Sequence, residues 1–588
     1  MCTDRIPVKA LWATTHSKDC SPATPAGDTR TLRFTDRSNR LSIEVEPAPW
    51  FPNCAQRLQE SAASGILQLV IGDYTEPGAS TKGRLCANAA LIEADLMRGR
   101  AHATSSLVGL PPIILRTDSL FNSFNCPLLP SLNSPGGVDI DGVADTLRWG
   151  HPLDGRTLYK DLAVVPPHSS VTLEANKSAA VERLSTTAPS VSYDTMSQAQ
   201  LLEAQIAAML TAAARLPDSD TFLSLSGGLD SRTALVALLS QGRRVPCVSM
   251  AGSPYSLDVR IARQFCNANG LRHQIIQFGD DYIQRLPDLA RKSAKLTGGV
   301  ACLSQTIDLY LYSQLEHAAA IRISGHLGNQ VGRGGVESIA AASLSEQIFS
   351  EDLRRALARR PLEPWFVPRM ADAGFASVLF GQEVHFWSVA NYMLGSANAL
   401  QLSPYADVTL LELSSAAFNR DPRYLNPTTA SIRRRDMQHR LVGPPRPQSF
   451  QRTLLTRYTT AGGNVPINLG WRARGGWSLR TAPVTLRWSA DALANKLGRQ
   501  YKVLNGPMTR VSRALGSPSA LVAWPDMMHG PLRDLAYDIL LSGDIAQSGL
   551  FEATNLRRTL DEHFAKRVDH HSTLFRALEI ALGLASRR

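Results

Sequence analysis

Apolar segments of strand length alternate with helix-length segments between residues 196 and 323, and this alternation constrains the fold more than any other feature of the chain. A strand that is buried on both faces is a short continuous apolar run, whereas a crossover helix needs ten or more residues. The predicted strands are 221–225, 245–250, 272–278 and 320–323, and the predicted helices are 198–216, 230–240 and 257–269. This spacing predicts an α/β fold with a parallel, doubly wound sheet.

The length of the chain, 588 residues, is too great for one compact core, so we expect at least two domains. The first, residues 1–190, is predicted to be β-rich, although residues 1–60 look irregular. Its predicted strands are 66–71, 112–117 and 170–174, with a short helix at 142–147 and a polar linker at 185–193. The second domain, residues 196–588, contains the predicted sheet and is mainly helical after about residue 337.

Charge and cysteine content exclude several classes of protein. The net charge is +11, but lysine and arginine are scattered and no basic segment is interleaved with aromatic residues, so we expect no nucleic-acid partner. None of the eight cysteines forms a CxxC pair, which argues against a zinc site or a disulfide framework. No apolar run is long enough to span a membrane, and no signal segment follows the first residues, so we expect a cytoplasmic protein without membrane contact.

A glycine pair follows the first predicted strand of the sheet. Gly227 and Gly228 allow a tight turn and a close approach of an anion to the backbone. The next helix points unpaired N–H groups and its positive dipole end at the same place, and Ser226 and Ser231 add hydroxyl groups. Bare phosphate would repel Asp230, so its predicted role is to bind Mg²⁺ that bridges phosphate oxygens. Together these groups predict a pyrophosphate site.

Other loops with glycine pairs fit this segment less well. A Walker A loop needs a Lys-Ser/Thr pair after its last glycine, and dinucleotide-binding folds use GxGxxG spacing; residues 226–231 have neither. The plain alternative is a Gly-Gly turn with an aspartate at the start of a helix. All six positions together, between an apolar strand and an apolar helix, favour the phosphate-binding interpretation.

Residues 226–231 resemble the SGGxDS loop of the asparagine synthetase family of N-type ATP pyrophosphatases. In that family the loop binds the pyrophosphate of ATP and the second strand lines the adenine pocket, so the resemblance implies ATP and Mg²⁺ as cofactors. The residues 256–258, Ala262 and His273 are also placed as in the family. The implied ATP-binding residues in this part of the chain are Leu225, Ser226, Gly227, Gly228, Asp230, Ser231 and Met250.

A second segment, residues 324–329, is similar to the family's SGxGxD loop. The resemblance implies that Ser324 and Gly325 contact the nucleotide. The last position is Asn329, where the family's metal-binding aspartate is usual, so Asn329 is a weaker candidate ligand and Asp230 the main one. His326 stands where relatives carry Glu or Tyr, and it is predicted either to act as a general base or merely to donate a hydrogen bond. Residues 403–407 resemble the family's PFLD segment.

The last third of the first domain, including 141–150 and 162–168, resembles the family's glutaminase-like, Ntn-type domain. A working glutaminase of this type needs an N-terminal cysteine whose own amine acts as base. Removal of Met1 would expose Cys2, but Thr3 replaces the family's glycine and no glutamine-binding segment is recognisable. We therefore predict that this domain is a degenerate scaffold without glutaminase activity.

Loss of the ammonia source favours ligases in which the attacking amine belongs to the substrate. Among such relatives, the pair Gly328-Asn329 most resembles lasso peptide cyclases. That resemblance implies a precursor peptide as substrate and a leader peptidase as partner. The alternatives are a glutamine- or ammonia-dependent asparagine synthetase, a β-lactam synthetase-like ligase, a tRNA-modifying pyrophosphatase and a non-enzymatic scaffold. Arg433, Arg434, Arg435 and Lys502 are candidates for the cation that binds pyrophosphate.

Overall fold

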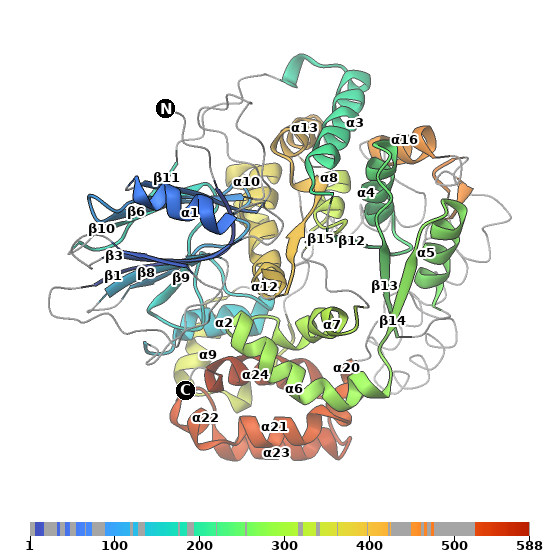
Figure 1. Cartoon of the computed structure of the whole chain (residues 1–588). Coiled ribbons are helices and arrows are strands. Elements are labelled where there is room, and N and C mark those ends of the chain that lie inside the picture. The colour runs from blue at the N-terminus through green and yellow to red at the C-terminus, as the bar shows by residue number, and fades with distance from the viewer. Residues whose placement is uncertain are drawn as a thin grey trace.

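The computed structural model describes most of the chain (Figure 1). The described residues are 6–16, 32–35, 41–47, 54–64, 66–72, 89–117, 121–126, 136–174, 177–184, 193–218, 220–252, 256–315, 321–336, 342–360, 363–396, 398–421, 424, 428, 449–459, 464–466, 472–474 and 524–586. The predicted linker at 185–193 lies outside them except for Tyr193, which begins the short helix η1 (Tyr193–Thr195).

The first part of the chain forms two layers of strands, seen at the left of Figure 1. Their hydrogen-bonded order is β11-β10-β6-β5-β4-β1-β8-β7-β9, with β3 on β1 and β2 on β3. Alternate residues of β3, β4 and β10, such as Ile43, Leu69 and Val171, point into one apolar core, as expected for sheets with one buried face. The strands are β1 (Ile6–His16), β2 (Leu32–Thr35), β3 (Leu41–Pro47), β4 (Ile66–Gly72), β5 (Ala89–Asp95), β6 (Arg100–Thr104), β7 (Ile114–Thr117), β8 (Phe121–Cys126), β9 (Leu162–Val164), β10 (Ser169–Glu174) and β11 (Ala180–Arg183).

The expectation that residues 1–60 are irregular is wrong. β1 pairs antiparallel with β3 from Thr15 opposite Leu41 to Val8 opposite Pro47, and on its other edge it pairs with β8. These partners are up to about a hundred residues away, so the pairing depends on long-range contacts that local composition does not reveal. The helices of this part are α1 (Cys54–Ala63) and α2 (Ile140–Trp149).

The second part contains the predicted parallel sheet, which the structure confirms. Its strand order is β14-β13-β12-β15-β16, and every neighbouring pair is parallel. The first three strands extend in one direction from β12 and the last two in the other, so the topological switch point lies between β12 and β15. In open α/β sheets, ligands bind at the carboxyl ends of the strands at such a point. The strands are β12 (Thr221–Ser224), β13 (Cys247–Ala251), β14 (His273–Gln277), β15 (Ile321–Ile323) and β16 (Leu400–Leu402).

Strand β16 was not predicted, because its three residues lie in a region whose apolar pattern resembles a helix. It is recognisable only from its pairing with β15, which places Leu402 beside Ile323. The helices around the sheet are α3 (Gln198–Arg215), α4 (Leu229–Ser240), α5 (Leu257–Ala268), α6 (Asp280–Thr297), α7 (Cys302–Ser313), α8 (Gly328–Arg333), α12 (Val384–Ser396), α13 (Val408–Asn419) and α16 (Ser449–Tyr458), with the one-turn helix η4 (Pro404–Ala406).

The remaining helices complete the second part of the chain, and the last ones along the chain lie in the lower part of the molecule in Figure 1. They are η2 (Glu346–Ile348), α9 (Glu351–Ala358), α10 (Phe366–Ala373), α11 (Phe375–Val378), the π-helix η3 (Leu379–Glu383), α20 (Trp524–His529), α21 (Leu532–Leu540), α22 (Gly543–Gln547), α23 (Ala553–Phe564) and α24 (His571–Ala585). In the described part of the chain, no helix combines the length and the apolar character that crossing a membrane requires.

Ion pairs join the two parts of the chain, and the pair Arg360–Asp145 is buried. Arg360, which follows α9, donates to the carboxylates of Asp141 and Asp145 on α2, at 2.7 and 2.8 Å. Arg148 near the end of α2 reaches Glu346 at 3.2 Å. The pKa of Asp145 is raised by burial in spite of the opposing effect of Arg360, so this carboxylate depends on its arginine partner. Helix α2 of the first part therefore lies against α9 of the second.

Candidate active site

The glycine loop has a defined internal structure. The Ser226 backbone N–H donates to Ser231 Oγ at 3.0 Å, and the two hydroxyl groups are also 3.0 Å apart. The Gly228 N–H donates to Ser226 Oγ at 3.2 Å. Gly228 is the N-cap of α4 and offers no side chain to the first N–H groups of the helix. The first turn of α4 can therefore present unpaired N–H groups to an anion.

Arg232 binds the backbone carbonyls of the glycine loop from inside the protein. This side chain has no exposed surface, although it is an arginine inside an otherwise apolar helix. Its guanidinium donates to the carbonyls of Gly228 (2.9 Å), Gly227 (3.2 Å) and Val465 (3.1 Å). Burial lowers the pKa of Arg232 to about 10, against the opposing effect of Asp258, so it remains charged at neutral pH. By binding the loop carbonyls on the inner side, Arg232 leaves the opposite side of the loop to its N–H groups.

The second predicted loop packs directly on the first. A side-chain carbon on Gly325 would lie 2.5 Å from the Ser231 backbone nitrogen, and one on Gly328 would lie 2.5 Å from the Asp230 side chain. Such distances are shorter than van der Waals contact, so these two positions require glycine. The structure therefore brings Ser324 and Gly325 to Ser226–Ser231 at the switch point.

Asp230 lies where three segments meet. The Gln451 Nε2 on α16 donates to Asp230 Oδ1 at 2.9 Å and to the Tyr405 hydroxyl at 2.8 Å. The Tyr405 hydroxyl donates to the Asp230 carbonyl at 3.1 Å. Desolvation raises the pKa of Asp230, and Arg333 and the Gln451 amide oppose this rise. The carboxylate is thus held in one orientation at the start of α4.

Asn329 has a different partner from the predicted metal ion. Its Oδ1 accepts a hydrogen bond from the Arg333 Nε, one turn further along α8. A magnesium ion bound by Asn329 would have to displace this guanidinium, so the structure does not favour the ligand role that the sequence suggested. The same geometry brings a cation, Arg333, to the site.

His326 points into the protein. Its Nε2 lies 2.7 Å from the hydroxyl of Ser388 on α12, and its ring lies 6.1 Å from the Tyr392 ring. Desolvation lowers the pKa of His326 to about 4, with a further lowering by Arg322 and an opposing effect of Asp308. The imidazole is therefore neutral at physiological pH. In this structure, Ser388 is the polar group in contact with Nε2.

A buried ion pair lies beneath the two loops. Arg322 on β15 bonds to Asp308 on α7 at 2.7 Å and donates to the Ser224 hydroxyl at the end of β12, also at 2.7 Å. These contacts tie the two central strands together below their carboxyl ends. Asp308 raises the pKa of Arg322 in spite of the desolvation that lowers it, which identifies Arg322 as a structural cation fully engaged in this pair.

The predicted adenine side of the site includes Leu225 and Met250. The Ser249 hydroxyl donates to the Leu225 carbonyl at 2.7 Å and lies 2.8 Å from His273 Nε2, so the imidazole donates to Ser249. Desolvation lowers the pKa of His273 to about 4. Met250 is half-buried at the end of β13, next to the segment that follows Leu225. These contacts fix the backbone where the strand passes into the loop.

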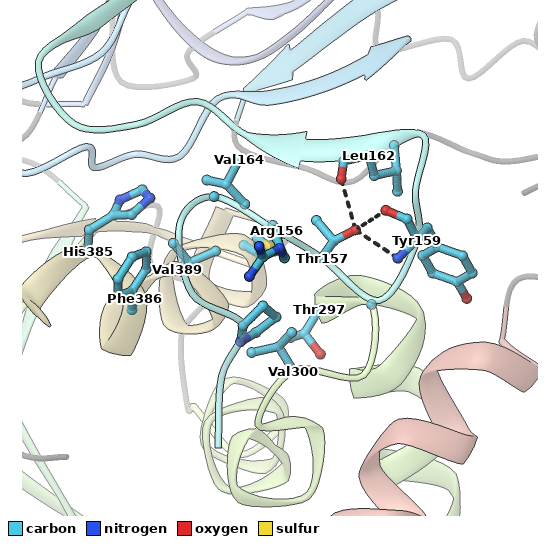
Figure 2. A pocket seen from close by; sticks show the side chains of 14 residues that line it. Arg156, Thr157, Tyr159, Leu162, Val164, Thr297, Val300, His385, Phe386 and Val389 are labelled. Carbon is cyan, nitrogen blue, oxygen red and sulfur yellow. Dashed lines mark hydrogen bonds between the residues drawn. The ribbon is translucent and has the colours of Figure 1, made fainter. Parts of the chain in front are cut away.

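A separate pocket lies between the first part of the chain and α12, and Figure 2 shows its side chains. None of its lining residues belongs to either loop. Most of them are apolar, and the charged Arg156 is paired with Asp145 at 3.2 Å. This pocket therefore lacks the groups that phosphate binding needs, and the chemistry of the site is placed at the loops.

Magnesium fits the described residues only in part. Asp230 supplies one carboxylate beside the phosphate loop, and Mg²⁺ is often held by one or two carboxylates together with substrate phosphates. In the described part of the chain there is no group of three or more His, Cys, Asp or Glu side chains that could hold a metal ion. Asp230 is the carboxylate that would hold a nucleotide-bound Mg²⁺, whose charge would balance that of the phosphates, and the described residues provide no separate metal cage.

Several predicted residues lie outside the described part of the chain: Cys2, Arg433, Arg434, Arg435 and Lys502. Other residues of the site were not predicted, namely Arg232, Arg333, Gln451 and Ser388, whereas Tyr405 belongs to the segment 403–407 that resembles the family's PFLD segment. The sequence held a signal for Arg232, because a charged residue inside an apolar helix needs a buried partner. Gln451 lies 221 residues from Asp230, and no local pattern connects them.

Comparison with known families agrees with this geometry. Residues 210–412 match the protein-family model for asparagine synthase. The matched range includes both loops and all five strands of the parallel sheet. This part of the chain is therefore similar to asparagine synthases, a family of ligases that use ATP. A search of curated proteins found no match to this chain.

Proposed function

We propose that this protein is an ATP-dependent macrolactam synthetase of the lasso peptide cyclase type. The substrate would be a ribosomally made precursor peptide, and a leader peptidase would be a partner of the same pathway. The observation that carries the adenylation step is the convergence of two glycine loops at the ends of β12 and β15, beside the Asp230 carboxylate. This constellation suits the triphosphate of ATP, and it does not identify the carboxylate that is activated.

The proposed reaction has two steps. An Asp or Glu side-chain oxygen of the peptide attacks the α-phosphorus of ATP, and the bond from that phosphorus to the bridging oxygen breaks with release of pyrophosphate. The peptide's N-terminal amine then attacks the activated carbonyl carbon, and AMP leaves as the amide forms. The N–H groups at the start of α4 would stabilise the charge on the departing phosphates, and Asp230 would hold Mg²⁺ against them.

Sequence features of the first domain support an amine from the substrate over ammonia. Thr3 follows Cys2, and no glutamine-binding segment is recognisable. A degenerate glutaminase-like domain would leave the synthetase without its own ammonia supply. The alternatives are an asparagine synthetase that uses glutamine or free ammonia, and a β-lactam synthetase-like ligase.

The test of this function is incubation of the full chain with ATP, Mg²⁺ and candidate precursor peptides, followed by mass spectrometry. The expected product is the peptide minus one water, together with AMP and pyrophosphate. A parallel incubation with aspartate plus glutamine or ammonium distinguishes the amidotransferase alternative. Asparagine formation there, with no dehydrated peptide in the first incubation, would contradict the cyclase.

His326 is the proposed general base for the amine. Replacing His326 by Ala should leave ATP–pyrophosphate exchange intact and slow ring closure by roughly 10²- to 10⁴-fold, the usual contribution of a positioned base. Ser388→Ala removes only the hydroxyl that lies beside Nε2, so we expect a smaller loss. Ring closure at the wild-type rate in the His326 variant would show that the histidine is structural.

A further inference from the structure

Arg333 is held beside the phosphate loop by neutral partners. Its Nε donates to Asn329 Oδ1, and its carbonyl accepts a hydrogen bond from the Tyr424 hydroxyl at 2.9 Å. Gly334, with a φ of +59°, ends α8 directly after it, so the backbone of Arg333 is fixed from both sides. The side chain itself is half-buried and retains access to solvent.

Helix α8 brings Arg333 to the side of Asp230. The Arg333 Nε donates to Asn329 Oδ1, and Asn329 directly follows Gly328, which packs on the Asp230 side chain. The guanidinium is thereby placed near the first turn of α4, whose N–H groups can bind an anion.

Two other described arginines next to the loops, Arg232 and Arg322, already bind partners within the protein. Arg232 donates to three carbonyls and is fully buried. Arg322 is paired with Asp308 and bonded to Ser224. In the described residues, by contrast, the Arg333 side chain has one hydrogen-bond partner, and that partner is a neutral carboxamide. A guanidinium held in this way can move to an anion without leaving a buried charge behind.

We propose that Arg333 binds the β- and γ-phosphates of ATP and the pyrophosphate that leaves. This proposal rests on the proposed adenylation. When the bond between the α-phosphorus and the bridging oxygen breaks, its electron pair stays on pyrophosphate, and the planar guanidinium can donate two parallel hydrogen bonds to the phosphate oxygens. Arg333 thereby supplies positive charge in a site where Asn329 stands in the position that a second carboxylate would need to hold metal.

The test measures binding of inorganic pyrophosphate to the full chain by titration calorimetry, with and without Mg²⁺. Arg333→Gln should weaken pyrophosphate binding by roughly 10- to 100-fold, the loss expected for hydrogen bonds to a charged group. Arg333→Lys keeps the charge but lacks the planar guanidinium that can donate two parallel hydrogen bonds. Its affinity for pyrophosphate should lie between those of the wild type and Arg333→Gln. Arg355→Gln on α9 removes the same charge far from the loops (Figure 1) and should bind like the wild type.

The outcomes separate this inference from the proposed function. If the wild type binds pyrophosphate and folded Arg333→Gln binds it equally well, Arg333 is only a counter-ion for Asp230, and the adenylation proposal stands. If the wild type does not bind pyrophosphate under either condition, both proposals fail. Thermal melting of each variant establishes that it is folded, and Arg333→Lys provides the comparison if Arg333→Gln is not.

Discussion

The orientation of single polar groups decides what the site can bind. Gln451 must donate both amide hydrogens, one to the Asp230 carboxylate and one to the Tyr405 hydroxyl, because that hydroxyl gives its own hydrogen to the Asp230 carbonyl. This series of hydrogen bonds leaves Gln451 Oε1 buried without a hydrogen-bond partner in the described structure. The arrangement is costly, and its effect is to fix the Asp230 carboxylate at the start of α4.

Replacing Asp230 by Asn tests the magnesium role. The amide has nearly the same shape but no charge, so it cannot balance a metal ion bound to phosphate. We expect ATP–pyrophosphate exchange to fall by roughly 10²-fold or more, with little change in melting temperature. Gln451→Leu is the matched control, because it removes the hydrogen bond from the Gln451 amide to the Asp230 carboxylate and leaves the charge of Asp230 in place. Exchange at the wild-type rate in Asp230→Asn would exclude Asp230 as the metal ligand.

Replacing Arg232 by Met tests the support behind the loop. The carbonyls of Gly227, Gly228 and Val465 would lose their donor, and buried unpaired acceptors cost about 1–3 kcal/mol each. We expect the free energy of unfolding to drop by roughly 3 kcal/mol or more and ATP binding to weaken. Urea unfolding measures the free energy of unfolding, and titration calorimetry measures the affinity for ATP. Unchanged ATP affinity in a folded variant would mean that the loop keeps its shape without the arginine.

The two loops act as one unit because glycines of the second loop pack directly on the first turn of α4. Gly325 faces the Ser231 backbone and Gly328 faces Asp230. β12 and β15 are neighbours in the sheet, so their carboxyl ends lie side by side and deliver both loops to one place. The elements were predictable from the sequence, since local apolar pattern and glycine position define them. Their adjacency follows from the strand order 14-13-12-15-16.

Replacing Gly325 by Ala tests this packing. The added carbon would lie 2.5 Å from the Ser231 nitrogen, and backbone atoms on both sides cannot move apart cheaply. We expect ATP binding to be lost or weakened by at least about tenfold, with destabilisation of roughly 1–3 kcal/mol. Gly543→Ala in α22 is the control, because no atom lies within 4 Å of the added carbon. Tight ATP binding by Gly325→Ala would show that the loops can separate.

At the scale of the whole molecule, burial keeps several histidines neutral. Desolvation is the main cause for each of those whose pKa is lowered to about 4: His151, His273, His326, His385 and His563. His385 on α12 is an example, because its Nδ1 bonds to the Gly109 carbonyl at 3.0 Å and so joins the second part of the chain to the first. In the unfolded chain these rings titrate near their ordinary pKa of about 6.5.

The sign of the resulting pH dependence follows from proton binding. Between pH 6.5 and 4 the unfolded state binds a proton at His385 and the folded state does not, so acidification favours unfolding in that window. Relative to the wild type, His385→Gln should lose up to about 1.4 kcal/mol per pH unit of this dependence. Urea unfolding measures this dependence of the free energy of unfolding on pH. The measurements are made at roughly one-unit steps across the window, at about pH 4.5, 5.5, 6.5 and 7.5. Equal slopes in the two proteins would mean that the pKa of His385 is the same in the folded and the unfolded state.

The sequence by itself determined the parallel α/β sheet and the glycine loop that joins β12 to α4, because both depend on local chemistry: apolar runs, a glycine pair and the first turn of a helix. It did not determine the strands before residue 60 or the strand Leu400–Leu402, which exist through pairing with distant partners. Only the tertiary structure decided that Asn329 is bound by Arg333, that Gln451 orients Asp230 and that His326 faces Ser388. The two last contacts join residues far apart in the chain, and all three depend on side-chain directions that packing selects.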